Sequence, residues 1–479
     1  MMKSLQILSL IVLATLGAAL TGCIEDGVSS SPSHQPVFST DTLDMGVIFT
    51  GEAAPTHRML VHNPHKKGMN ISDIRISGPM ADCFRINVDG MTGREFSNVE
   101  IRQKDSIFVL VGATLPENDR DVPVKVTASL DFTVNGVTNS VTLAASGQNV
   151  RRLEATVLDT DTRFDGRRPY QIFDSLVVSE GTTLTLEAGT TLCFHDKSML
   201  IVRGTLVSEG TVEAPVTMAG DRTGNVVSDI SFDIMSRQWT GVFFTASSHG
   251  NILTNTNIRN TWQGVAISGD GNAETPALTM VNCRLRNSGG LVFEAVHSNV
   301  LAVGCEFAEG ADGLVYLQGG NATFNHCTFA NYYLFSALGG PAVQFAHIGV
   351  TAKPELQYDD GSGLPFLAAD FSNSIVYGLG GDLSHGDLLG SDVFFRNCLL
   401  KSAGSDDDNF VSCLWDADPL YYTVREDYIF DYRLRPDSPA IGTADATLTL
   451  PQAATDGYGL PRGAAPDLGA YVFTPEAAE

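Results

Sequence analysis

Positive charge is scarce in this chain. Of its 479 residues, 30 are Lys or Arg and 55 are Asp or Glu, which gives a formal net charge of −25 at pH 7. Nucleic-acid binding needs a basic surface that neutralises phosphates, so this composition argues against nucleic acid as a partner. It also argues against docking on an anionic membrane surface through basic patches.

Several chemical signatures are missing as well. The sequence has no nucleotide-binding loop, no Cys/His set with zinc spacing and no nucleophile elbow. Charged residues make up only 18% of the chain, whereas hydrophobic residues reach 43% and glycine numbers 47. Low charge with abundant Gly, Thr, Val and Asn favours an all-β protein that is large enough to bury a sizeable core.

The N-terminal apolar run is short for a membrane-spanning helix. It follows Lys3, covers the 16 residues from Leu5 to Leu20, and leads into Leu20-Thr21-Gly22-Cys23. These four residues resemble the lipobox of bacterial lipoproteins. The resemblance implies that residues 1–22 are a signal peptide and that Cys23 is acylated. More than one acyl chain gives stable anchoring to a membrane without a spanning helix.

Residues 23–36 are rich in Ser and Pro and predict a flexible tether. The acidic pair Glu25-Asp26 resembles the surface-export signal of lipoproteins in some anaerobic commensal bacteria. We therefore expect a lipid-anchored protein of the outer membrane that is exposed on the cell surface. Retention on the periplasmic face is the alternative.

Residues 37–150 contain about seven short segments with strand-like composition, separated by turns. Asn135-Gly136 lies between two of them and predicts a tight hairpin. This pattern is typical of an Ig-like β-sandwich. The region also resembles the Hydin-type (ASH) Ig-like family, and the motifs that carry the resemblance are Asp44-Met45-Gly46, Val61-His62-Asn63-Pro64, Phe84-Arg85-Ile86, Lys104-Asp105-Ser106-Ile107 and Leu143-Ala144-Ala145-Ser146-Gly147.

A repeat begins after Arg151. Three cysteines recur at intervals of 22 residues, each two positions before a large apolar residue, and this period is typical of a solenoid. Single coils cannot bury their apolar side alone and must stack on their neighbours. We expect one small residue per coil to form an inward ladder, whose members are Thr256, Cys283, Cys305, Cys327, Ser374 and Cys398.

The ladder cysteines have three possible roles. Free Cys packs as a small buried hydrophobe, and this is the preferred interpretation. Disulfides are permitted by an exported location, although parallel side-chain directions on adjacent coils disfavour their geometry. Metal ligation is the third alternative.

Two irregular stretches are candidates for binding. The period lapses between Ala330 and Ala369, which predicts a loop that leaves the coil and carries Tyr332, Tyr333 and Tyr358 as possible sugar platforms. Trp239 and Trp262 are further candidates for stacking, or are core residues. The acidic run Asp406-Asp407-Asp408 predicts either a solvated turn or a calcium site, possible also with Asp359 or Asp360 from the adjacent loop.

The tail, residues 446–479, predicts a cap that closes the last coil, fastened by Arg462 paired with Asp456 or Asp467. Residues 151–445 and this tail together resemble the pectate-lyase-like β-helix superfamily. The expected fold is thus all-β, with an Ig-like sandwich followed by a right-handed single-stranded parallel β-helix.

Catalysis is not predicted. A hydrolase needs paired carboxylates and a lyase needs a base with a cationic floor, and neither is evident within 240–330, where Glu294, Glu306, Glu309 and Asp312 are scattered. His195, His326 and His347 are expected to be packed or in turns. We expect no cofactor, apart from possible calcium. The preferred hypothesis is a non-catalytic surface lipoprotein whose β-helix binds a glycan or an extracellular partner; the alternatives are a polysaccharide lyase or glycoside hydrolase, and a structural spacer.

Overall fold

The structure is a computed structural model that describes residues 27–475, except 228–229, 272–274, 351–358 and 385–387. Two residues of the predicted sites, Cys23 and Tyr358, lie outside the described residues. The chain divides into two compact units, Met1–Gln148 and Asn149–Glu479. No helix in the described part is long and apolar enough to cross a membrane.

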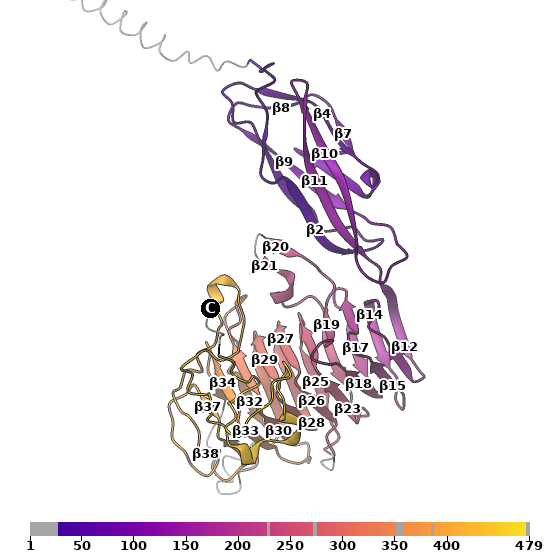
Figure 1. Ribbon diagram of the computed structural model, residues 1–479. Helices are drawn as coiled ribbons and strands as arrows, with labels where there is room; N and C mark the ends of the chain where they lie inside the picture. The colour runs from indigo at the N-terminus through magenta and orange to yellow at the C-terminus, as the bar shows by residue number, and fades with distance from the viewer. Residues whose placement is uncertain (1–26, 228–229, 272–274, 351–358, 385–387, 476–479) are drawn as a thin grey trace, which may run out of the picture. The chain divides into compact units, whose positions relative to one another are not determined.

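The first unit is built from two sheets that share one hydrophobic core, as an all-β sandwich should be (Figure 1). Most neighbouring strands are antiparallel, but β2 pairs with β11 in parallel. One sheet has the order β1 (Val37–Phe38), β3 (His57–His62), β9 (Ser106–Ala113), β5 (Phe84–Val88), β6 (Met91–Gly93). The other has the order β2 (Thr42–Phe49), β11 (Val137–Gln148), β10 (Val124–Val134), β4 (Met69–Ser77), β7 (Glu95–Phe96), with β8 (Val99–Ile101) also on β4 and the 3-10 turn η1 (Ala81–Cys83) before β5.

The predicted hairpin joins β10 to β11. Asn135 and Gly136 both have positive φ, 49° and 77°, which is the geometry that a two-residue turn between twisted strands requires. The predicted tether is shorter than expected. His34 stacks on His65 with ring centroids 4.2 Å apart, and the backbone N–H of Ser29 donates to the carbonyl of Gly68 at 2.8 Å. The segment therefore packs on the sandwich from Val28 onward, because its polar groups find partners there.

The second unit is a coil in which each turn adds a strand to three parallel sheets (Figure 1). The first sheet contains the C-terminal parts of β12 (Arg151–Leu158) and β14 (Tyr170–Val178), then β17 (Met199–Val202), β22 (Gly241–Phe244), β25 (Val265–Ser268), the N-terminal parts of β28 (Leu291–Val303) and β30 (Gly313–Asn325), β32 (Val343–Ala346) and β35 (Leu383–Ser384).

The second sheet contains β13 (Thr162–Phe164), β15 (Thr183–Leu186), β18 (Thr205–Glu209), β23 (Asn251–Thr254), β26 (Leu278–Val281), the C-terminal parts of β28 and β30, β33 (Ala368–Ser372), β36 (Asp392–Arg396) and β38 (Phe410–Val411). The third sheet contains the N-terminal parts of β12 and β14, then β16 (Thr191–Phe194), β19 (Val216–Gly220), β24 (Thr256–Arg259), β27 (Arg284–Ser288), β29 (Glu306–Gly310), β31 (Thr328–Asn331), β34 (Ile375–Gly378) and β37 (Leu399–Leu400).

A single residue in the left-handed conformation makes the tight bend between the second and third sheets. Asn tolerates this conformation better than most residues, which explains its repetition at the bend. Gly304 replaces Asn in one coil, where a Cβ would lie 2.3 Å from Oδ1 of Asn282. The bend residues and their φ angles are Asn255 (41°), Asn282 (52°), Gly304 (64°), His326 (51°), Asn373 (51°) and Asn397 (53°).

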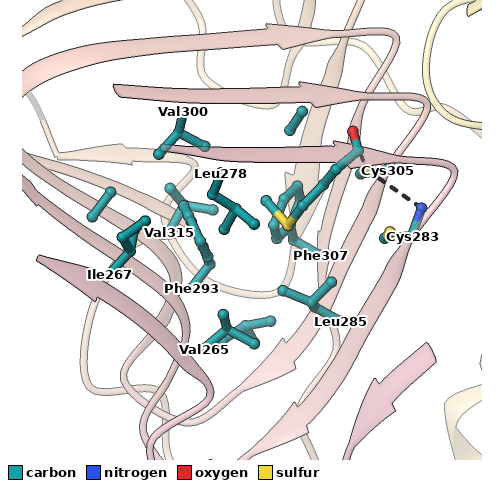
Figure 2. Packing of buried hydrophobic residues seen from close by; sticks show 14 of the residues in the cluster. Val265, Ile267, Leu278, Cys283, Leu285, Phe293, Val300, Cys305, Phe307 and Val315 are labelled. Atoms are coloured by element: carbon teal, nitrogen blue, oxygen red, sulfur yellow. Dashed lines mark hydrogen bonds between the residues drawn. The ribbon is translucent and has the colours of Figure 1, made fainter. Parts of the chain in front are cut away.

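The residue after each bend points inward and forms the ladder. All six predicted members are fully buried, and the four cysteines among them are free thiols. The backbone N–H of Cys283 donates to Sγ of Cys305 at 3.4 Å, as Figure 2 shows beside the packed interior. The N–H of Cys327 donates in the same way to Oγ of Ser374 at 3.0 Å. The small side chains thus accept from the backbone of the preceding coil.

Aromatic rings stack along the interior of the second sheet. Phe324, Phe371, Phe395 and Phe410 occupy successive coils with interplanar angles of 7° and centroid separations of 4.8, 4.5 and 5.1 Å. These separations match the inter-strand distance, because parallel register places identical positions directly above one another.

The coil continues through the stretch that was predicted to leave it. β32 lies within 330–369 and pairs with β30, so the insertions lie on either side of this strand. An earlier insertion after β19 carries β20 (Asn225–Val227), β21 (Ile230–Ser231) and the 3-10 turn η2 (Phe232–Ile234).

The C-terminal segment does not close the last coil as predicted. After an isolated bridge between Leu399 and Leu414, it packs on the outer face of the third sheet and forms a second core there. This is possible because the outward residues of that sheet are apolar in the later coils. They are Ala308, Ala330, Ile375 and Leu399, covered by Tyr421, Tyr432, Leu434, Ala440, Leu468, Ala470 and Tyr471. Three 3-10 turns lie in the segment: η4 (Arg425–Asp427), η5 (Ala446–Leu448) and η6 (Pro451–Ala453).

Part of this segment, residues 443–456, follows the bend residues backward along the coil. The amides of four bend-region asparagines donate to its carbonyls: Asn397 to Thr443 at 2.9 Å, Asn373 to Asp445 at 2.9 Å, Asn325 to Leu448 at 2.9 Å and Asn282 to Asp456 at 3.3 Å. Arg462 was predicted to pair with a carboxylate. Instead its guanidinium donates to the carbonyls of Asp467, Gly469 and Ala470, since burial places backbone acceptors nearest to it.

Candidate functional site

A groove runs across the outer face of the first sheet. Its floor is one column of outward side chains in register on successive coils: Phe243, Ala266, Glu294, Tyr316 and Gln344. The groove has a volume of about 520 Å³, and its lining residues are Phe243, Gln263, Ala266, Gly290, Leu291, Glu294, Asp312, Tyr316, Gln318 and Gln344. Sequence reasoning missed it, although the regular spacing of Ala266, Glu294 and Tyr316 becomes visible once the strands are aligned.

Two carboxylates line this groove on neighbouring coils. Glu294 lies in β28 and Asp312 in the turn before β30, so residues that look scattered in the sequence face the same space. Burial raises the pKa of Glu294. The uncharged carboxylic acid is therefore favoured at Glu294, which is the state that can donate a hydrogen bond or a proton.

Tyr316 is oriented by a chain of hydrogen bonds. Its hydroxyl donates to Oε1 of Gln318 at 2.9 Å, and Nε2 of Gln318 donates to Oδ2 of Asp360 at 2.7 Å. Nε2 of His297 donates to the same carboxylate oxygen at 2.8 Å. Burial raises the pKa of Tyr316, and the nearby charges of Glu294 and Asp360 act in the same direction. The ring is thus held neutral and fixed across the groove.

The same Asp360 belongs to the group in the described part of the chain that offers ligands for a cation. One ligand atom from each of His347, Asp359 and Asp360 lies within 4.8 Å of the others. Nε2 of His347 lies 3.0 Å from the carbonyl of Leu364, the partner that commonly orients a metal-binding imidazole. One nitrogen and two carboxylates suit a transition metal better than calcium. Hydrogen bonds from Ser362, then from His297 and Gln318, lower the pKa of Asp360 and already occupy its oxygens.

The tyrosines predicted as sugar platforms are packing residues. Tyr333 is 2% exposed and hydrogen-bonds through its hydroxyl to Ser236 at 2.7 Å. Tyr332 packs at the edge of the core under the C-terminal segment, against Tyr432 with ring centroids 5.9 Å apart. Apolar outward residues attract a covering segment, which is why these rings are hidden.

The two tryptophans proposed for stacking differ from each other. Trp239 is fully buried and stacks on Phe194 at 3.9 Å, so it is a core residue. Trp262 is 44% exposed, and the guanidinium of Arg237 lies 4.9 Å from its ring. It directly precedes Gln263, which lines the groove.

The acidic run 406–408 shapes its own loop. Asp406 accepts the backbone N–H groups of Ser412 and Cys413 and the indole N–H of Trp415, while Asp407 accepts those of Asn409 and Phe410. Among the described residues, these carboxylates form no group that can share an ion, with or without Asp359 or Asp360. Adjacency in sequence suggested a calcium site, whereas the loop uses two of the three carboxylates as backbone acceptors.

Comparisons with known proteins bear mainly on the second unit. A search of the curated proteins found no match. Among solved structures, a protein of unknown function from Porphyromonas gingivalis W83 is 12% identical with a TM-score of 0.18, covering 24% of this chain and 49% of its own. A family 123 glycoside hydrolase from Clostridium perfringens is 10% identical with a TM-score of 0.18, covering 24% of this chain and 26% of its own. The chain thus spans about half and about a quarter of these two structures.

A family comparison identifies the coil itself. Residues 177–329, about a third of the chain, match the family described as "Right handed beta helix region". This segment runs from β14 to β31 and includes the three cysteines at 22-residue spacing. The all-β fold, with its continuous set of parallel pairings, agrees with the match, and the second unit is therefore a right-handed parallel β-helix.

Proposed function

We propose that this protein binds an extended glycan in the groove on the first sheet. The observation that carries the proposal is the register of Glu294, Tyr316 and Gln344 with Phe243 along one continuous groove. The column spans five strands, about 19 Å at roughly 4.8 Å per strand, which suits several sugar units in a row. Amide and carboxyl groups can bind sugar hydroxyls, and an aromatic ring can pack on a sugar face.

The charges in the groove favour an uncharged glycan. Its lining includes two carboxyl groups, Glu294 and Asp312, and no Lys or Arg. A polyuronate would bring further negative charge to this surface, and like charges repel. The amides of Gln263, Gln318 and Gln344 can both donate and accept, as hydroxyl recognition requires.

A glycan array that carries neutral and uronate-containing oligosaccharides tests the proposal, followed by titration calorimetry on the hits. Tyr316→Ala should weaken binding of a neutral hit at least tenfold, since it removes the ring and its hydroxyl. Tyr428→Ala is the matched control, because Tyr428 is 37% exposed and does not line the groove. Equal loss in both variants, or no neutral hit at all, would contradict groove binding.

Glycoside hydrolysis is the second candidate, and a specific observation favours it. The raised pKa of Glu294 is the property of a general acid, and Asp312 supplies a second carboxylate in the same groove. Reducing-end release from a bound glycan measures this activity. Glu294→Gln should keep binding in either case, but it should abolish release if Glu294 is the acid. No release by the wild-type protein leaves binding alone.

We further propose that the first unit is an Ig-like spacer and that lipid on Cys23 holds the protein at the outer membrane, facing the surface. The Leu20-Thr21-Gly22-Cys23 motif supports the anchor, and the acidic pair after Cys23 supports export. Cys23→Ser should abolish lipid labelling and release the protein from membranes. Protease added to intact cells should remove a surface-exposed protein, whereas full protection would place it on the periplasmic face.

A further inference from the structure

A second cleft lies on a different side of the β-helix, on the outer face of the third sheet. It has a volume of about 250 Å³, the space of about eight liquid water molecules. Strands β24, β27 and β29 form its floor, the 3-10 turn η2 forms one wall and Phe430 of the C-terminal segment forms another. All these parts belong to the second unit.

Three guanidinium groups meet in this cleft. Arg259 and Arg286 are register partners on β24 and β27, and Arg284 lies two residues before Arg286 on the same side of β27. The expectation that arginine is too sparse in the coils for a cationic floor was therefore wrong. Residues from coils 25 positions apart converge here because the register of the strands aligns them.

Two of these arginines have carboxylate partners. Arg286 forms a double hydrogen bond with the buried Glu306, which also accepts the hydroxyl of Tyr471 at 2.5 Å. Arg259 pairs with Asp233 at 3.0 Å, but its buried Nε has no partner.

The third arginine lacks a carboxylate. Among the described residues, Arg284 has none within ion-pair distance, and its guanidinium lies over the rings of Tyr458 and Tyr471 at 4.5 and 5.4 Å. The cleft therefore keeps a local excess of positive charge in a protein whose net charge is −25.

A buried carboxyl group completes the site. Glu309 is 1% exposed and accepts the hydroxyl of Tyr432 at Oε1, while Oε2 has no hydrogen-bond partner. Burial raises the pKa of Glu309 well above its usual range. A neutral carboxyl group carries a proton that needs an acceptor, and an unmade hydrogen bond of a buried group is costly.

We infer that this cleft binds the oxyanion of a sugar-sized acidic ligand, a carboxylate or sulfate ester. The anion would accept from Arg284, from Nε of Arg259 and from the carboxyl proton of Glu309. Each of these donors lacks an acceptor among the described residues. The amides of Asn257 and Asn287 also line the cleft and suit hydroxyls of the same ligand. The site is independent of the groove on the first sheet, and it takes the charged ligands that the groove disfavours.

Titration calorimetry with the full chain tests the inference. The probes are galacturonate, glucuronate, galactose 6-sulfate and, as the neutral control, galactose. The wild-type protein should bind at least one anionic probe saturably and at least tenfold more tightly than galactose, since charge-assisted hydrogen bonds are stronger than neutral ones. Uronate and sulfate arms distinguish the source of the oxyanion. Binding of galactose equal to that of every anionic probe would overturn the inference.

Variants place the binding in the cleft. Arg284→Gln should weaken anion binding at least tenfold, and Arg259→Gln, on the opposite wall, should weaken it as well. Arg203→Gln changes an exposed arginine outside the cleft and should have no effect. Glu309→Gln should retain binding, because the amide remains a neutral donor, whereas Glu309→Leu should lose it. Circular dichroism confirms folding of each variant. Unchanged affinity in folded Arg284→Gln and Arg259→Gln would refute the site.

Discussion

His326 should make the β-helix sensitive to mild acid. Its side chain is fully buried at a bend position, Nδ1 lies 3.1 Å from the carbonyl of Asp467, and Nε2 lies 2.9 Å from the hydroxyl of Thr449 and 3.2 Å from the amide nitrogen of Asn373. This arrangement assigns the proton to Nδ1 and leaves Nε2 as an acceptor. Burial, and then the charge of Arg462, lower the pKa of His326 to about 3.

The sign and size of the effect follow from linkage. The unfolded chain has a histidine pKa of about 6.5, so it takes up a proton below that pH while the folded protein does not. Stability from this residue is complete above pH 6.5 and is lost progressively as the pH falls toward 3. At pH 5 the loss is about 2 kcal/mol, from 1.4 kcal/mol per tenfold protonation ratio.

His326→Asn isolates this effect, because asparagine occupies the equivalent bend at positions 282, 373 and 397 with similar φ. All three tryptophans, at positions 239, 262 and 415, lie in the second unit, so tryptophan fluorescence during urea unfolding reports on that unit. The wild-type protein should lose about 2 kcal/mol more than His326→Asn between pH 7.5 and pH 5. Equal losses in the two proteins would refute the assignment of a buried neutral imidazole.

Three further predictions concern the interior. Glu306→Ala should destabilise the second unit by about 3–5 kcal/mol because it leaves Arg286 buried without its partner, whereas loss of the exposed Glu187 should cost about 0–1 kcal/mol; urea midpoints measure both, and similar values would contradict a buried ion pair. Phe371→Ala should cost about 3–5 kcal/mol, since Phe371 is in the middle of the aromatic stack; a change below about 1 kcal/mol would mean that the stack does not pack as described. Cys283 and Cys305 should not react with a thiol reagent at pH 8 until the protein unfolds, because burial raises the pKa of both thiols well above the usual value; prompt labelling of the native protein would show that they are accessible.

The coil could be predicted from the sequence because its signals are local and repeated. Cys283, Cys305 and Cys327 are evenly spaced, and the Asn before Cys283 marks a bend. The groove and the cleft could not be found in the same way. Glu294 and Tyr316, or Arg284 and Glu306, become neighbours only through the strand register, and insertions of unequal length obscure that register in the sequence.

The placement of the C-terminal segment was missed for another reason. Its signal was present in strands β29, β31 and β34, which are apolar at both inward and outward positions, as in Phe307-Ala308 and Phe329-Ala330. Strands that are buried on both faces need a covering layer. The sequence alone does not tell which part of the chain supplies that layer.

The hydrogen bonds from residues 443–456 to the bend asparagines change how this solenoid can come apart. Coils of a β-helix ordinarily touch only their neighbours, so a terminal coil can peel away without disturbing the rest. Here one strip of chain is fastened to positions 397, 373, 325 and 282 in turn, which ties distant coils into a closed circuit. The last coils cannot unzip one by one until that strip has been stripped off. The part of the β-helix from β27 to β37 should therefore yield as a single block, and during synthesis it becomes locked only when the last part of the chain has been made.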